Sequence, residues 1–376
     1  VGLDWRFLDS RIGLDFTYYK ENTRDQIMTI DVPRPSGVRQ KLINAGNIQN
    51  SGIEIALNTT PYKRGDWQWD LNLTYTRNRN KIVELSPDVA SYINLDGAAT
   101  YGNYRIASVA KVGSDYGMLM SDSWIKTDEK TGKPIIGYSN NYRTVYYKRG
   151  GTVKEVGSML PDFLGTVNTT LRWKDLSLYV LFDARFGGYV ASYNSRYSTA
   201  YGFSGASENY RKGMTWTSRY DNAKDKTFTD GFIPDAIFDK GTVVTAPDGT
   251  QHDVGGMTYQ EAYEKGYVEP AHMQSHGYFK NSWGQGVIND DWFKKLNYIA
   301  LREVTLSYNV PRRLCGYIGA KSLALNLTGR NLAYLLNTAP NHENPESVRG
   351  TGAAQFRMRS FMPYTASYLF TLNATF

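Results

Sequence analysis

The sequence predicts an all-β protein, a transmembrane antiparallel β-barrel to which this chain contributes about eleven C-terminal strands. Three observations predict this fold class. Apolar and polar residues alternate with a period of two along most of the chain. Several alternating segments are far longer than the usual strand of about 5–6 residues. The connections between them alternate between short and long, which is typical of outer-membrane barrels.

The last eleven residues, ASYLFTLNATF, are the most informative segment. Alternate positions are apolar and end on an aromatic residue: Tyr368, Phe370, Leu372, Ala374 and Phe376. A closing strand of this kind resembles the terminal signal by which bacterial outer-membrane barrels are recognised for insertion. We therefore expect Tyr368, Phe370, Leu372 and Phe376 to form an insertion signal. The alternative is an ordinary half-buried strand that ends a domain.

Long strands are expected at residues 11–30, 41–60 and 66–85. The clearest alternation is WQWDLNLTY, residues 67–75, in which Trp67, Trp69 and Leu71 share one face with Leu73 and Tyr75. Residues 299–310 lose the alternating phase near Arg302 and Glu303. We interpret that loss as a β-bulge or a strand end at the membrane interface.

The connections divide into two groups by length. Short turns are expected near residues 9–10, 61–65, 113–115, 173–175 and 311–319. Long connections are expected at residues 31–40, 86–102, 127–162, 190–296 and 334–365. Short periplasmic turns and long extracellular loops are the outer-membrane pattern, so residues 190–296 are expected to form a large extracellular loop.

Composition narrows the class of protein. The chain has 376 residues, 41% hydrophobic content and a mean hydropathy of −0.48. No run of about 18 apolar residues could form a transmembrane helix. The lone Cys315 excludes an internal disulfide and a cysteine-based zinc site. The net charge of +7 is scattered rather than clustered, so we expect no nucleic-acid partner.

An open sheet of about eleven long strands would expose two hydrogen-bonding edges, which a membrane does not tolerate. Single-chain bacterial barrels normally have an even number. The chain also begins within an alternating segment, VGLDWRF. We therefore expect residues 1–376 to be the C-terminal part of one barrel domain, with the N-terminal strands absent and the remaining half of the barrel as a partner.

Candidate functional residues follow from this arrangement. Polar residues expected to face the lumen are Asp15, Glu54, Asp70, Arg172 and Arg185. Tryptophans beside short turns, expected to form an aromatic girdle rather than core, are Trp67, Trp69 and Trp173. Aromatic residues of the large loop that are candidates for contact with substrate or lid are Tyr193, Tyr197, Tyr201, Trp216 and Tyr220. The alternative for the last group is that these rings only pack the loop on itself.

No catalytic or metal-binding constellation is evident. His272 and His276 have the i, i+4 spacing of two ligands on a helix, but no third ligand is obvious and a loop is favoured. The acidic stretches 221–225 and 247–253 do not match an EF-hand. We expect no cofactor and no enzymatic activity, and calcium in an extracellular loop stays an unsupported alternative.

Specific motifs then point to a family. Residues 44–85 match a motif of two parts, a strand with the pattern N-x-G-x-x-x-N-x-G-h-E (h is apolar) and a later N-x-N-K segment. The matching residues are Asn44, Gly46, Asn50, Gly52, Glu54, Asn78, Asn80 and Lys81. Two further segments match, residues 157–188, which contain P-D-F and end in G-G, and residues 293–311. The G-R-N-L hairpin, the NHENPES segment and the terminal Phe376 match as well. In this order they resemble the barrel of SusC/RagA-type TonB-dependent outer-membrane transporters.

The resemblance implies a 22-stranded barrel with an N-terminal plug and a SusD-like surface lipoprotein as lid. It also implies a nutrient importer of oligosaccharide or oligopeptide. The implied partners are the SusD-like lipoprotein, TonB through the missing N-terminal part, and outer-membrane lipid and lipopolysaccharide. The alternatives are a SusC-like structural subunit of an outer-membrane assembly complex, a siderophore or cobalamin receptor, and a soluble glycan-binding sandwich protein.

Overall fold

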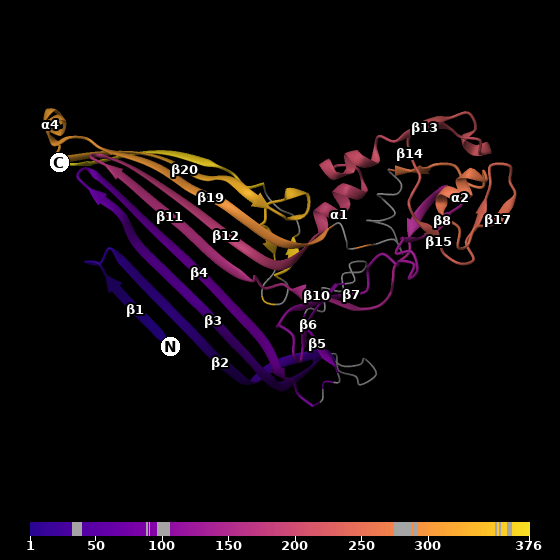
Figure 1. Ribbon diagram of the computed structural model, residues 1–376, viewed down its shortest axis with the longest axis horizontal. Helices are drawn as coiled ribbons and strands as arrows, with labels where there is room; N and C mark the ends of the chain where they lie inside the picture. Colours follow the sequence, from indigo (N-terminus) through magenta and orange to yellow (C-terminus); the bar gives the residue numbers. More distant parts are fainter. Residues whose placement is uncertain are drawn as a thin grey trace.

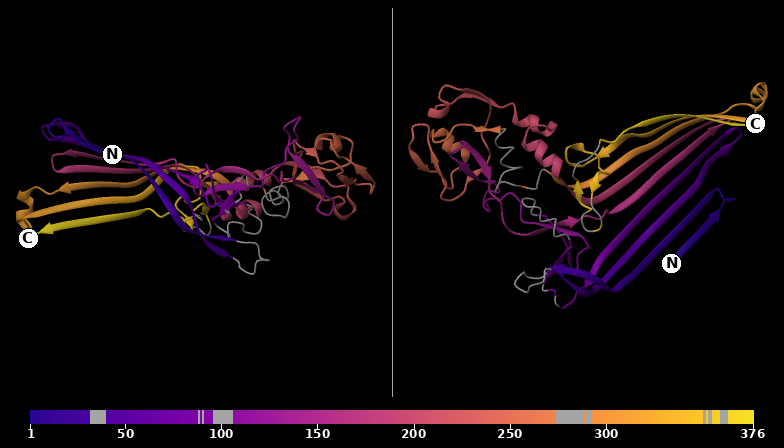
Figure 2. Two further views of the ribbon diagram at one scale, coloured as in Figure 1. Left: turned by 90° about the horizontal axis from the view of Figure 1, so that it is seen from below. Right: turned by 180° about the vertical axis from the view of Figure 1, so that it is seen from behind.

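The computed structural model describes residues 1–31, 40–87, 89, 91–95, 106–273, 288, 292–349, 352, 355–358 and 363–376. Its main feature is a long, twisted and curved antiparallel sheet (Figures 1 and 2). Nine strands follow one another in hydrogen-bonded order: β1 (Gly2–Phe7), β2 (Ile12–Asp31), β3 (Gln40–Arg64), β4 (Trp67–Glu84), β11 (Phe163–Trp173), β12 (Leu176–Ser192), β19 (Phe293–Asn309), β20 (Ser322–Asn337) and β23 (Ser367–Thr375). The two-residue strands β21 (Val348–Arg349) and β22 (Arg357–Met358) attach beside β12 and complete an eleven-stranded sheet. The count of eleven thus includes two short strands, and nine strands follow the main order of the sheet.

The expected alternation of connections is present, with one correction. Four connections, 8–11, 65–66, 174–175 and 310–321, lie at one end of the sheet. The connections 85–162, 193–292 and 338–366 extend from the other end, where the remaining folded elements gather (Figure 1). The turn at 113–115 does not belong to the first group, because it joins β6 (Ile106–Lys111) to β7 (Met118–Ser121) within a separate small sheet. Strands of six and four residues are too short to cross a bilayer, which takes about 9–11.

Strand pairing separates the sheet into an apolar and a polar face, because directly opposed residues in antiparallel strands point the same way. One continuous cross-strand row on the apolar face runs through Trp67, Trp173, Leu176, Tyr308, Leu325 and Leu372. The next row contains Trp69, Leu171, Leu178, Leu306, Leu327 and Phe370. These rows are largely exposed in the isolated chain, as in a sheet whose apolar face is covered by lipid.

Two of the motif glycines occupy positions where a side chain would clash with a neighbouring strand. Gly52 of β3 pairs directly with Tyr19 of β2, and a Cβ on Gly52 would lie 2.3 Å from the Tyr19 ring. Gly46 has a φ of +76°, and a Cβ there would lie 2.1 Å from the Glu84 carbonyl oxygen. Motif residue Asn50 accepts a hydrogen bond from Asn80 of β4 at 2.9 Å. The motif residues on β3 therefore allow this strand to pair closely with β4 on one side and with β2 on the other.

The expected phase change in β19 is a β-bulge. The register shifts between Leu301 and Glu303 against β20, and the opposing shift on β12 falls between Leu181 and Phe182. Arg302 is the extra residue, and its side chain reaches the polar face, where it contacts Asp183.

Beyond the long-connection end, short elements build smaller units. One four-stranded sheet joins β5 (Tyr92–Asn94), β6, β7 and β10 (Lys154–Ser158). A unit that we call the loop subdomain contains β8 (Ile135–Ser139), β9 (Thr144–Tyr147), β13 (Met214–Thr217), η3 (Asp221–Ala223), β14 (Thr227–Phe232), β15 (Ile237–Phe238), β16 (Val243–Thr245), β17 (Gln251–Asp253), α2 (Tyr259–Glu264) and β18 (Ala271–His272). Its core packs Ile136, Phe238 and Tyr259 with eight further buried residues. Figure 1 shows it standing clear of the main sheet.

The remaining helical elements flank the sheet at its two ends. α1 (Tyr193–Ala200) and η2 (Gly205–Tyr210) follow β12, whereas α4 (Arg312–Cys315) and η5 (Gly316–Ile318) form the turn before β20. η6 (Pro340–His342) lies after β20. Within the described residues, no helix has both the length and the apolar character needed to cross a membrane.

We predict that Gly52→Ala destabilises the sheet by about 1–3 kcal/mol, because the new methyl group must displace the Tyr19 ring. Gly13→Ala on β2 is the matched control, since a Cβ there meets no atom closer than 3.9 Å. The measurement is the temperature at which each purified variant in detergent loses its folded-barrel mobility on a gel. Equal temperatures for the two variants would contradict the steric explanation.

Candidate functional site

The five residues expected to face the lumen all lie on the polar face. Asp15 belongs to the cross-strand row of Ala56, Thr74, Thr166 and Asp183. Glu54 and Arg185 belong to the neighbouring row of that face, and Asp70 and Arg172 lie nearer the short-turn end. That they line a lumen stays a prediction.

Hydrogen bonds within the polar face are numerous. Asp70 accepts hydrogen bonds from Thr60 at 2.8 Å and Gln68 at 2.9 Å and forms an ion pair with Arg172. Asn72 donates to Asn168 of β11 at 2.7 Å, across the pair of strands. Arg185 donates to the Met159 carbonyl oxygen at 3.3 Å. Asp70, Arg172 and Arg185 are therefore already engaged by other groups of the protein.

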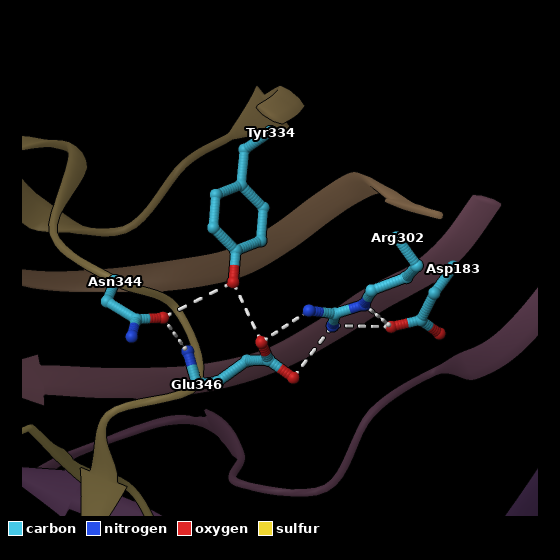
Figure 3. A network of polar contacts seen from close by, with 5 residues as sticks. All are labelled: Asp183, Arg302, Tyr334, Asn344 and Glu346. Atoms are coloured by element: carbon cyan, nitrogen blue, oxygen red, sulfur yellow. Dashed lines mark hydrogen bonds and ion pairs between the residues drawn. The ribbon is translucent and has the colours of Figure 1, made fainter. Parts of the chain in front are cut away.

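The strongest ionic site is a cluster that we call the rim network, formed by Asp183, Arg302, Tyr334, Asn344 and Glu346 (Figure 3). Arg302 donates to Asp183 at 2.7 and 3.1 Å, and to both carboxylate oxygens of Glu346 at 2.7 Å. Two hydrogen bonds from one guanidinium to one carboxylate fix the relative orientation of the two groups and also pair their charges. The Arg302 side chain is only 18% exposed, so water screens these bonds weakly.

Three separate strands and one connection build the rim network. Asp183 comes from β12, Arg302 from the β19 bulge and Tyr334 from β20, whereas Asn344 and Glu346 follow η6. The Tyr334 hydroxyl donates to Glu346 at 2.8 Å, and Asn344 accepts from the Glu346 backbone N–H at 3.1 Å. Burial alone would raise the pKa of Glu346, but hydrogen bonds from Arg302 and Tyr334 hold that pKa below its ordinary value. The network fastens the connection after β20 to the polar face.

The same connection also docks on α1. The Ser192 hydroxyl donates to the buried carboxylate of Glu343 at 2.6 Å and accepts from the Ser195 backbone N–H at 2.9 Å as the N-cap of α1. Asn341 donates to the Thr199 hydroxyl at 3.2 Å. Burial raises the pKa of Glu343 to about 7, although the Ser192 hydrogen bond acts in the opposite direction.

The candidate aromatic residues of the large loop fall in two places. Tyr193, Tyr197 and Tyr201 form a stripe along α1, with ring centroids 4.6 and 6.1 Å apart. Trp216 belongs to the loop subdomain, where it stacks on Phe228 at 4.9 Å. Tyr220 is buried in that subdomain and its hydroxyl donates to the Thr245 carbonyl oxygen. The structure therefore does not gather the five residues into one surface, and their contact with substrate or lid stays a prediction.

The girdle and insertion-signal residues share the apolar face. Trp67 and Trp173 stack with ring centroids 5.6 Å apart beside the short turns, and the Trp69 indole donates to Thr169. Tyr368, Phe370 and Leu372 continue the same face on β23, and the Phe376 carbonyl oxygen accepts from Lys321 at 2.8 Å. Their positions suit the predicted roles, which stay predictions.

The described part of the chain contains no cluster of metal ligands. No group of three or more His, Cys, Asp or Glu residues there could hold a metal ion. His272 instead lies 3.0 Å from Asp230, and His276 lies outside the described residues.

Sequence reasoning missed the rim network and the Glu343 contact. Arg302 was singled out only as a loss of strand phase, and Glu346 and Glu343 only as letters of the NHENPES motif. A lone arginine inside a strand, combined with the two glutamates of the NHENPES motif, is the signal that could have paired them.

We predict that Arg302→Gln weakens docking of residues 341–349 by about 2 kcal/mol, because it leaves two carboxylates without their cation. Arg330→Gln is the matched control. Its ion pair with Glu303 is 55% exposed on the arginine side and is expected to contribute under about 1 kcal/mol. Amide hydrogen exchange of residues 341–349 in detergent reports the docking. Equal exchange in the two variants would contradict the network's role.

We further predict that docking weakens as pH rises. The docked Glu343 has a pKa of about 7, above the ordinary 4.5, so the stabilisation is fully present below about pH 4.5 and is lost as pH rises through about 7. The total effect is about 3 kcal/mol. Hydrogen exchange of α1 and residues 341–347, corrected for intrinsic rates, measures it. Glu343→Gln should remove the pH dependence, and a persisting dependence would assign it to another group.

Comparisons with known proteins agree with the fold. Residues 1–133 match the family model described as TonB dependent receptor-like, beta-barrel. Two TonB-dependent receptors of Formosa agariphila are 27% identical over 205 residues and 23% identical over 339 residues. These alignments cover 51% and 88% of this chain but 20% and 29% of the relatives. The TonB-dependent receptor SusC of Bacteroides thetaiotaomicron is 28% identical over 138 residues, which is 36% of this chain and 14% of SusC.

Solved structures give the same fold over the whole chain. The RagAB peptide importer in its "closed-closed" state matches with a TM-score of 0.59 at 15% identity, covering 100% of this chain and 35% of that chain. The "open-open" state matches with a TM-score of 0.57 at 14% identity, covering 100% and 34%. The chain thus spans about a third or less of the length of each of these proteins. Fold, motifs and relatives agree that this chain is part of an outer-membrane β-barrel similar to those of the SusC/RagA-type TonB-dependent receptors.

Proposed function

We propose that the chain belongs to a TonB-driven importer that moves an oligomeric nutrient, oligosaccharide or oligopeptide, across the outer membrane. The observation that carries the proposal is the division of the sheet into an apolar face and a polar face whose end is covered by docked connections. Such a wall excludes lipid from the solute path, and connections held by a few polar contacts can be moved by a ligand.

A SusD-like surface lipoprotein is the proposed lid, and TonB would act through a plug domain. Both follow from likeness to SusC and to the RagAB peptide importer. No catalytic step is proposed, because binding, gating and release suffice for import. Passage is gated: the lid and the connections at the rim enclose the solute before the plug moves.

The α1 tyrosine stripe is the proposed contact with solute or lid. Stacked rings that are partly exposed offer flat apolar faces to sugars or to side chains. Tyr197→Ala with Tyr201→Ala should lower uptake at limiting solute roughly tenfold. Tyr317→Ala, at an 87% exposed aromatic in the opposite turn, is the matched control.

The test is uptake of labelled oligosaccharides and oligopeptides by intact cells, with and without a protonophore that removes the driving force for TonB. Energy-dependent uptake that falls in the double variant and not in the control supports the proposal. The native complex isolated through this chain should contain a SusD-like lipoprotein. A complex dominated by barrel-assembly proteins, with no uptake, would favour a structural subunit, and uptake of iron chelates without a lipoprotein would favour a siderophore receptor.

A further inference from the structure

The loop subdomain contains two adjoining hollows, of about 190 and 530 Å³, which together we call the loop pocket. They share the lining residues Tyr142, Phe228 and His272. At about 30 Å³ per water, the smaller hollow holds roughly six waters and the larger one is open to solvent. The loop pocket therefore has room for more than one ring-sized unit of an oligomer.

Aromatic rings form one wall of the loop pocket. Trp216 and Phe228 stack at 4.9 Å, and His272 meets both rings at 4.8 Å. Tyr142, at the turn between β8 and β9, is 60% exposed. Flat ring faces of this kind stack on the apolar faces of sugar rings.

Two arginines, Arg143 and Arg211, and two carboxylates line the loop pocket. Its carboxylates are already engaged, because Glu269 accepts hydrogen bonds from Ser218 and the Arg219 backbone, and Asp230 contacts His272. Arg143 lies over the Tyr220 ring at 4.0 Å, and its Nη1 finds no hydrogen-bond partner among the described residues. Arg211 donates only to the Gly202 carbonyl among the bonds found in the described chain. Neither guanidinium forms an ion pair there, so the pocket favours an anion.

The rest of the lining favours a sugar over a peptide side chain. Of the remaining lining residues, Asn141, Asn222, Thr227 and Thr229 offer amides and hydroxyls that match sugar hydroxyls, and Ala223 and Pro270 are apolar. The described lining contains no Leu, Ile, Val or Met, so its apolar surface consists mainly of ring faces.

We propose that the loop pocket binds an acidic oligosaccharide, one whose rings carry carboxylate or sulfate groups. A ring stacks on Tyr142 and the Trp216–Phe228 wall, and acidic groups are held by Arg143 in the smaller hollow and Arg211 in the larger one. This deepens the proposed import function by naming a substrate class, but binding at the loop pocket requires neither TonB nor a lid.

The test is calorimetric binding to the full-length protein in detergent, with trigalacturonate as the probe. Its fully methyl-esterified form has the same rings without the charge, a sulfated galactose disaccharide carries the other acidic group, and triglutamate supplies acidic charge on a peptide. Trigalacturonate, the sulfated disaccharide or both should bind at least tenfold more tightly than the ester, which is about 1.4 kcal/mol, and binding should weaken with salt. The two acidic sugars distinguish carboxylate from sulfate as the source of charge.

Tyr142→Ala and Arg143→Gln should each raise the Kd about tenfold. Tyr142 is exposed, so its variant keeps the fold even where loss of Arg143 loosens the Tyr220 contact. Phe203→Ala, at an 83% exposed ring outside the pocket, and Arg313→Gln, in the opposite turn, should leave the Kd unchanged. Equal binding of acid and ester, binding of triglutamate alone, or no effect of Tyr142→Ala would overturn the proposal. Because uptake is not measured, these outcomes leave the import proposal to its own test.

Discussion

The structure depends on one constraint, the pairing of backbone N–H and C=O groups across the long sheet. In a bilayer no water is present to satisfy these groups, so each strand must find its partners in its neighbours. Pairing then forces side chains to alternate between two faces. In the part of the chain that the structure describes, the apolar rows through Trp67 and Trp69 are largely exposed, and the four buried clusters found there lie at or beyond the long-connection end. Strand pairing and lipid stabilise the wall, whereas apolar packing stabilises the loops.

Because of this division, the ion pairs of the sheet lie on one face and at the end of that face. Along the face, Asp70 and Arg172 neutralise each other within two neighbouring strands. At the rim, Arg302 joins two strands to a connection and is far less exposed than Arg172, 18% against 49%. Less exposure means weaker screening, so the rim network contributes more to holding its partners together. The bulge at Arg302 is what turns this side chain toward Asp183 and Glu346.

The sequence predicts the strands of the long sheet well and the contacts at the end of its polar face poorly, and the reason is physical. Alternation depends only on neighbours in sequence, so β2, β3, β4 and β23 could be placed, and Gly52 and Asn50 could be recognised by motif. The rim network joins residues 44 and 119 positions apart, and the loop pocket joins Tyr142 to His272; no local pattern encodes either. The turn at 113–115 was misassigned because short alternating segments look alike in a spanning hairpin and in a small sheet above the rim.

The loops differ in how they are held, and this decides where motion can occur. The loop subdomain has its own buried core, which strongly favours moving as a unit over deforming. The connection after β20 is held by discrete polar contacts, to Arg302 on one side and to Ser192 on the other. Polar contacts of this type can be exchanged for contacts with a ligand at modest cost, whereas a packed core cannot. A solute entering along the polar face would therefore displace the segment around Glu343 and Glu346 before it disturbs α1 or the strands.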